Sequence, residues 1–286
     1  MNARVKMVAA MGIFGTLGPF VRNIEISSGE LALYRAVLAT ILIGVFFILT
    51  RRPIVLGQSR RELPYLFASG VAIGLNWILL FEAYKYTTIS IATLCYYFAP
   101  ILVTLVCPIL FKEKLSSRQI ICFAMSTLGI VLITGIGTDT SGSLLGILCG
   151  LGAAVFYATA VVLNKFIKNV DGIDRTMLQF LAAILILLPY VTVTNGFNLE
   201  RLDSLGWTCL LIVGCIHTGF TYCLYFSSLK DLPGQKVAIL SYIDPLVAIA
   251  ISVLILNETM SGIQIIGGTL ILVFTLLNEL GPVRKK

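Results

Sequence analysis

The stretch Tyr96-Tyr97-Phe98-Ala99-Pro100 lies at the centre of an apolar segment that occurs twice in the chain. The whole segment, Phe81–Ile121, aligns without a gap with Phe226–Ile266. The alignment pairs identical residues along its length: Phe81 with Phe226, Lys85 with Lys230, Tyr97 with Tyr242, Pro100 with Pro245, Glu113 with Glu258, Ser116 with Ser261 and Gln119 with Gln264. An internal repeat decides how the rest of a sequence is read. We therefore interpret the chain as two copies of one unit, residues 1–140 and 141–286.

The composition is unlike that of a water-soluble domain. Of the 286 residues, 58% are hydrophobic and only 12% are charged, and the mean hydropathy is +0.96. A soluble domain has about 25% charged residues, so this chain has too few to cover a surface that faces water. We predict an all-α integral membrane protein. The net charge of +7 does not indicate nucleic-acid binding, because most basic residues lie in short segments between apolar runs.

Apolar runs long enough to cross a bilayer, about 20 residues each, recur along the chain. We predict ten spanning helices: Val5–Asn23, Gly29–Leu49, Leu63–Tyr84, Thr88–Phe111, Ser117–Gly135, Ser143–Lys165, Thr176–Thr194, Leu205–Ser228, Gly234–Leu256 and Gly262–Leu280. Five spans per copy is an odd number, so the second copy enters the membrane from the opposite side. The predicted fold is ten transmembrane helices in two inverted-topology five-helix repeats, an architecture of transporters. A duplication kept only for packing is the alternative.

Lysine and arginine concentrate on one side of the predicted membrane. They lie before the first span, in the connections after the second, fourth, sixth and eighth spans, and in the tail. Because cytoplasmic connections carry such an excess, we predict a multi-pass plasma-membrane protein with both termini in the cytoplasm. The repeat agrees: Lys112-Glu113-Lys114 keeps its lysines, whereas the matching Asn257-Glu258-Thr259 on the other side has none.

Polar residues at membrane depth are costly and are therefore candidate functional residues. Asp244 is the sharpest candidate, because it lies about eight residues, or roughly 12 Å, inside the predicted ninth span. The following Pro245 frees the carbonyl of Ser241. A substrate or proton site competes here with a neutral carboxyl that supports a kink. Tyr97 and Tyr242 are expected to face one shared cavity, with aromatic packing as the alternative.

The other candidate residues have two interpretations each. For Glu82 we expect an ion pair with Arg35 or with Lys85, either for coupling or gating or purely for structure. His217 is either a proton relay or a neutral packed side chain. The further candidates for substrate binding are Asn76, Trp77, Pro100, Tyr157, His217, Tyr222 and Pro245. Glu113 and Glu258 are interpreted as helix-terminal residues.

The sequence contains no phosphate loop, no zinc-binding H-E-x-x-H helix and no nucleophile elbow. One histidine cannot build a multi-histidine metal site, and the seven cysteines fall inside apolar runs without metal-ligand spacing. We therefore expect a protein that is not an enzyme, has no cofactor and no metal, and is not driven by ATP hydrolysis. The alternatives are an integral membrane enzyme centred on His217 and Asp244, and a non-transporting membrane sensor or scaffold. These patterns leave the oligomeric state open.

The two five-helix units, each with a proline-bearing helix followed by Glu and Gln, resemble the drug/metabolite transporter superfamily and its EamA-type ten-helix permeases. The resemblance rests on Tyr97-Phe98-Ala99-Pro100 with Glu113 and Gln119, Tyr242-Ile243-Asp244-Pro245 with Glu258 and Gln264, Gly12-Ile13-Phe14-Gly15, and Tyr34-Arg35. It implies a central cavity lined by the first, third, fourth, sixth, eighth and ninth helices. It also implies secondary or facilitated transport of small metabolites by alternating access. Amino acids or related amines are the expected substrates, export is the expected direction, and proton coupling through Asp244 is a candidate mechanism.

Overall fold

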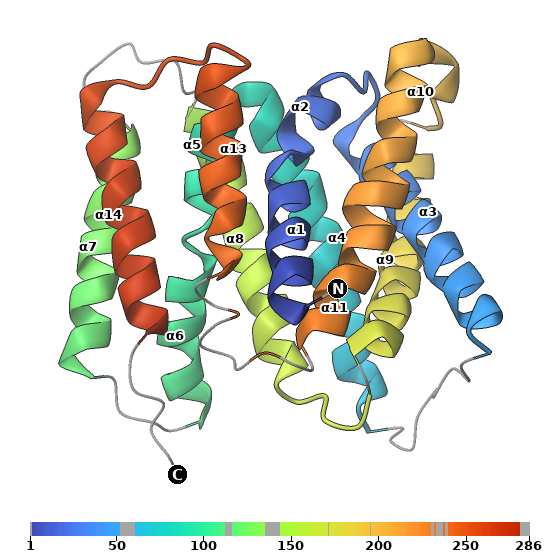
Figure 1. The fold of residues 1–286 in the computed structure, drawn as a ribbon, viewed down its shortest axis with the longest axis horizontal. Helices are drawn as coiled ribbons and strands as arrows, with labels where there is room; N and C mark the ends of the chain where they lie inside the picture. The colour runs from blue at the N-terminus through green and yellow to red at the C-terminus, as the bar shows by residue number, and fades with distance from the viewer. Residues whose placement is uncertain are drawn as a thin grey trace.

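The computed structural model describes residues 2–51, 61–111, 116–134, 144–170, 172–194, 196–229, 232, 237 and 240–280. Within these ranges every regular element is a helix (Figure 1). The helices are α1 (Ala3–Gly15), α2 (Leu17–Arg22), α3 (Ser28–Leu49), α4 (Leu63–Tyr86), α5 (Ile89–Tyr96), α6 (Ala99–Phe111), α7 (Ser117–Thr134), α8 (Leu144–Asn164), α9 (Gly172–Thr194), η1 (Leu199–Arg201), α10 (Ser204–Leu211), η2 (Ile212–Phe220), α11 (Thr221–Leu229), α13 (Ile243–Leu254) and α14 (Gly262–Glu279).

Seven helical stretches of the described chain are long and apolar enough to cross a membrane: Ala3–Arg22, Ser28–Leu49, Leu63–Tyr86, Ile89–Cys107, Leu144–Asn164, Gly172–Thr194 and Ser204–Ser228. Three shorter apolar helices coincide with the predicted fifth, ninth and tenth spans: Ser117–Ile133, Ile243–Leu254 and Gly262–Asn278. The prediction of an all-α, multi-pass membrane protein is confirmed. Much of the first part of the predicted ninth span lies outside the described residues, as do the cluster at 112–114 with Glu113 and the basic residues at 230, 236 and 284–286.

Four of the predicted spans are not continuous α-helices, and one of them, the ninth, has a turn at Tyr242 directly before α13. The first breaks at Thr16 between α1 and α2, and the fourth breaks between α5 and α6. The eighth widens into the π-helical segment η2 between α10 and α11. Two of the breaks have a common cause. A helix tolerates proline in its first turn, where the missing N–H has no intrahelical partner, and Pro19 and Pro100 each lie in the first turn of the restarted helix.

Corresponding residues of the two sequence copies have corresponding local structure. Tyr97 caps the C-terminal end of α5 with φ −70° and ψ 3°, and its counterpart Tyr242 precedes α13 with φ −73° and ψ −8°. The last helix of each copy, α7 and α14, also begins in the same way. Reciprocal hydrogen bonds join Ser116 to Gln119 at the start of α7 and Ser261 to Gln264 at the start of α14. These capping boxes satisfy backbone N–H groups that a helix start leaves unpaired.

The helices pack into one bundle with the interrupted helices in its middle (Figure 1). At one edge α7 and α14 lie side by side, where a Cβ on Gly129 would stand 2.6 Å from the carbonyl oxygen of Gly267. In the middle α1 crosses α13 closely, because a Cβ on Gly15 would stand 2.6 Å from the carbonyl oxygen of Asp244. These glycines allow the helix backbones to approach each other, and the crossing at Gly15 holds α1 against the start of α13.

Two pairs of glycines spaced four residues apart, Gly70/Gly74 and Gly146/Gly150, also lie at helix contacts. Gly70 faces the backbone of Gln179 on α9, and Gly150 faces Cys95 on α5. Close packing of α4, α5, α8 and α9 at these small residues forms the wall behind the central site.

Candidate functional site

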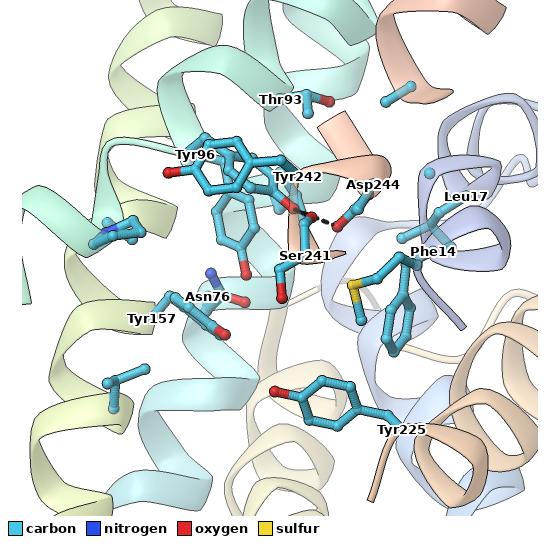
Figure 2. Close-up of a pocket in the computed structure, with 18 of the residues that line it drawn as sticks. Phe14, Leu17, Asn76, Thr93, Tyr96, Tyr157, Tyr225, Ser241, Tyr242 and Asp244 are labelled. Atoms are coloured by element: carbon cyan, nitrogen blue, oxygen red, sulfur yellow. Dashed lines mark hydrogen bonds between the residues drawn. The ribbon is translucent and has the colours of Figure 1, made fainter. Parts of the chain in front are cut away.

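A cavity of about 510 Å³ lies between the helices at the level of the breaks near Tyr97 and Tyr242 (Figure 2). Its walls contain residues of all six predicted helices, the first, third, fourth, sixth, eighth and ninth, and Arg35 from the second. Tyrosines dominate the lining: Tyr84, Tyr96, Tyr97, Tyr157, Tyr222, Tyr225 and Tyr242. A tyrosine offers an apolar ring and a polar hydroxyl, so this lining suits a ligand with an apolar body and a few polar groups.

Asp244 lies in this cavity at the start of α13 and is held by Tyr97. The Tyr97 hydroxyl donates to Oδ2 of Asp244 at 2.7 Å, and it lies 3.3 Å from the carbonyl oxygen of Ser241 (Figure 2). That carbonyl is the group that Pro245 frees from its helical partner. The kink therefore places a backbone acceptor and a carboxyl side by side, and Tyr97 from the other sequence copy contacts both.

The two repeat-related tyrosines lie close to each other, as the sequence predicts. The ring centroids of Tyr97 and Tyr242 are 6.2 Å apart, and Tyr96 extends the group to Tyr157 on α8 at 5.3 Å. Trp77 lines the same cavity. Residues from both sequence copies thus form one aromatic wall, which is what a cavity between two related halves requires.

Arg35 is the cation of the cavity lining and has no acidic partner among the described residues. Its Nε donates to the hydroxyl of Thr218 at 2.6 Å, and its guanidinium carbon lies 4.5 Å from the ring centroid of Trp77. The predicted alternative of an Arg35–Glu82 pair is therefore wrong. Glu82 lies 3.5 Å from Lys85, one turn along α4, because that partner is on the same helix face.

Several other predicted residues also line the cavity: Asn76, Trp77, Pro100, Tyr157 and Tyr222. Asn76 additionally ties α4 to α8, because its Nδ2 donates to the carbonyl oxygen of Ala153 at 2.7 Å. Pro245, Glu82 and His217 are not among the lining residues. Pro245 acts beside the cavity through the kink, and Glu82 belongs to the ion pair near the C-terminal end of α4.

His217 packs in the interior, next to the break between α1 and α2. Its Nε2 lies 2.8 Å from the hydroxyl of Thr16, and its ring centroid is 5.0 Å from that of Phe20. The Thr16 hydroxyl also donates to the carbonyl oxygen of Ile13 at 2.8 Å, and Nδ1 of His217 lies 3.4 Å from the carbonyl oxygen of Ile212. This geometry agrees with the predicted packed side chain and ties η2 to the break.

A network of hydrogen bonds surrounds Glu258 where α2, α4, α5 and α13 meet at one end of the bundle (Figure 1). Arg22 forms an ion pair with Glu258 and donates to the carbonyl oxygen of Thr87 at 3.0 Å. The backbone N–H of Ile89 donates to Glu258 at 3.0 Å. The Ser252 hydroxyl bonds to Glu258 and accepts from the Ser90 hydroxyl at 2.6 Å. The carboxylate thus stabilises the start of α5, as its predicted helix-terminal role requires, and also joins four helices.

Sequence reasoning missed the partners of Arg22, the widening of η2, and the cavity positions of Tyr84, Tyr96 and Tyr225. For Tyr96 a signal existed, because it directly precedes Tyr97 at the break. Arg22 also gave a signal, because only three basic residues, Arg22, Lys85 and Arg201, lie in the short segments of the predicted acidic side. The described residues contain no group of three or more His, Cys, Asp or Glu side chains that could hold a metal ion.

The comparisons with known proteins agree with this geometry. The chain matches the model of the EamA-like transporter family at residues 4–135 and 144–279. It is 34% identical over 257 residues to the uncharacterized transporter YxxF of Bacillus subtilis (strain 168), covering 87% of this chain and 80% of the relative. It is 24% identical over 257 residues to a protein of Salmonella typhimurium (strain LT2) named "Probable amino-acid metabolite efflux pump", covering 84% and 85%.

A solved crystal structure shares the fold. It has a TM-score of 0.67 with this chain at 17% sequence identity, and the match covers 96% of each chain. An apolar helical bundle and a central tyrosine-lined cavity thus accompany two family matches that together span nearly all of the sequence. The chain belongs to the EamA-like transporter family.

Proposed function

We propose that this membrane transporter is a secondary or facilitated permease that exports amine-bearing small metabolites, such as amino acids, by alternating access. Asp244 carries the proposal, because it is a carboxyl at membrane depth that lines the cavity. Among the described residues, its one hydrogen-bond partner is Tyr97, and no cation pairs with it. A substrate ammonium, or an exchanged proton, supplies the missing partner. The name of the Salmonella typhimurium relative points to the same substrate class.

We propose that the bundle is ten transmembrane helices in two inverted repeats, residues 1–140 and 141–286, with both termini in the cytoplasm. Three observations support this arrangement: the two separate family matches, the matched helix breaks at Tyr97 and Tyr242, and the matched capping boxes of α7 and α14. In this orientation the Glu258 network is an outer seal. The cavity lies on its inner side, because its lining extends from the start of α13 back to Ser241 and Val237, whereas Glu258 follows the other end of α13.

Substrate flux in proteoliposomes tests the proposal. The full chain is reconstituted, loaded with a pool of L-amino acids and amines, and assayed for efflux and for counterflow with and without a pH gradient. We expect flux well above that of protein-free liposomes, lost on replacement of Asp244 and retained on replacement of an exposed acid such as Glu25. Chemical conversion of the pool without its movement would indicate an enzyme instead, and neither conversion nor movement would contradict the proposal.

A further inference from the structure

Arg35 is a cation buried deep in the bundle, and none of the described acidic residues pairs with it. It lies seven residues, about 10 Å, inside the start of α3, and the residue is only 3% exposed. Arginine stays charged in proteins, and a charge at this depth is retained only where something compensates it. Among the described residues, the groups that stabilise the charge of Arg35 are a hydroxyl and the faces of aromatic rings.

The side chain is held so that one edge of the guanidinium is occupied and the other is not. Nε donates to Thr218, whose own hydroxyl proton is used by the carbonyl oxygen of Val213 at 2.8 Å. The ring centroids of Trp77 and Phe81 lie 4.5 and 5.6 Å from the guanidinium carbon. Three elements, α3, α4 and η2, therefore orient the group, and the π-helical widening of η2 is what presents Thr218.

The free edge of Arg35 is available to the cavity. A guanidinium carries five N–H donors, and the hydrogen bonds of the described residues use only the one on Nε. Arg35 is among the residues that line the cavity, and no ion pair joins it to Asp244, which lines the same cavity. One cavity thus contains an unpaired cation and an unpaired carboxyl.

We propose that Arg35 is an anion subsite that binds the substrate's carboxylate through its two Nη groups, while Asp244 faces the ammonium. This inference rests on the proposed transport function and narrows it: the ligand is a zwitterion, and an amine without a carboxylate is rejected. A planar guanidinium binds a carboxylate with two parallel hydrogen bonds. A site built for that bond disfavours an analogue that lacks it, because the buried donors then stay unpaired. Trp77 and Thr218 are positioning residues that keep Arg35 in place.

Matched ligand pairs test the subsite. The purified full chain is assayed with L-phenylalanine and L-leucine against phenethylamine and isoamylamine, the same molecules without the carboxylate. Counterflow is measured in proteoliposomes, and ligand-induced stabilisation against thermal unfolding is measured in detergent. We expect the wild type to favour the amino acids at least about tenfold, the equivalent of 1.4 kcal/mol. Arg35→Gln should lower amino-acid transport about tenfold and reduce the preference to about twofold or less.

The variants separate the subsite from a structural role. Arg35→Lys keeps the charge but loses the fork and the stacking on Trp77, so part of the preference should remain. Thr218→Val leaves Arg35 in place without its Nε acceptor and should weaken the preference by raising the apparent KM for amino acids. Arg4→Gln, an exposed arginine at the start of α1, is the control and should match the wild type. If Arg35→Gln does not fold, the preference for amino acids over amines in the wild type and in Thr218→Val decides whether Arg35 is an anion subsite.

The outcomes distinguish this inference from the transport function. Amines moved and bound as well as the amino acids by the wild type would overturn the subsite and leave transport standing. An unchanged preference in a folded Arg35→Gln protein would also overturn it. Stabilisation by amino acids but not by amines, without any flux, would support the subsite and contradict transport.

Discussion

Arg22 and Glu258 form an ion pair that joins the end of α2 to the segment after α13, next to the start of α5. The Glu258 side chain is 8% exposed, whereas that of Arg22 is 34% exposed. Replacing Arg22 by a neutral residue therefore leaves a mostly buried carboxylate without its cation. A buried charge without a partner is strongly destabilising. In the proposed orientation this pair holds the outer end of the cavity closed.

We predict that Arg22→Gln opens the outer end more often. A loss of about 1.4 kcal/mol would raise the outward-open population about tenfold. A cysteine at Thr93, which lines the cavity, in a background without native cysteines, should then react faster with a membrane-impermeant thiol reagent added outside. Glu25→Gln, which neutralises an exposed acid, is the control. Equal reactivity in Arg22→Gln and the control would mean that the pair is not a seal.

A labelling experiment tests the orientation of the chain. Cysteines at Glu200 in η1 and at Arg61 before α4 occupy exposed positions at opposite ends of the bundle. With both termini in the cytoplasm, the cysteine at 200 should react with an impermeant reagent in intact cells. The cysteine at 61 should react only after permeabilisation. The reverse pattern would place the termini outside and contradict the interpretation of the basic residues.

Tyr97 should matter through its hydroxyl as well as its ring. Tyr97→Phe removes the donor to Asp244 and to the Ser241 carbonyl, and loss of a hydrogen bond to a charged or buried group costs about 1–3 kcal/mol. We expect the apparent KM for substrate to rise roughly fivefold to a hundredfold, while membrane expression stays near wild type. Tyr190→Phe, at an exposed tyrosine of α9, should have no effect. Tyr97→Ala should reduce transport further still, again more than expression.

The packing of α7 on α14 gives a prediction about stability. Gly129→Val places a side chain where a Cβ would already stand 2.6 Å from the Gly267 carbonyl oxygen, so the helices must separate, at a cost of about 1–3 kcal/mol. Thermal unfolding in detergent should show a lower Tm. The matched control is Gly44→Ala in α3, where a Cβ meets nothing within 4 Å, and the Tm should hold or rise. A Gly129→Val protein as stable as wild type would contradict the close contact.

The sequence predicts those parts of the site that depend on local backbone chemistry. Pro245 lacks an N–H wherever it stands, so the freed carbonyl of Ser241 follows from spacing alone. The break beside Tyr97 does not, because the sequence predicts one continuous fourth span there. Arg35 shows the limit of that reasoning. Its partners Thr218 and Trp77 lie on other helices, and the sequence pattern suggested Glu82 because both residues were placed near the outer ends of neighbouring spans. Which side chains meet across the bundle depends on helix rotation and on the widening of η2, and neither has a local signal.

The central prediction concerns Asp244, whose carboxyl is bonded to Tyr97 and lines the cavity. Asp244→Asn keeps the size of the side chain and an oxygen that accepts from the Tyr97 hydroxyl, so the kink at Pro245 should survive. The negative charge and the exchangeable acidic proton are lost. We therefore expect a variant with wild-type expression and Tm that loses most substrate flux, or loses its response to a pH gradient. Asp203→Asn, a capping acid at the start of α10 outside the cavity, is the control for removing one carboxylate. If Asp244→Asn proteoliposomes moved substrate at the wild-type rate with the wild-type pH response, Asp244 would be a helix-kink partner and not the group that meets the substrate.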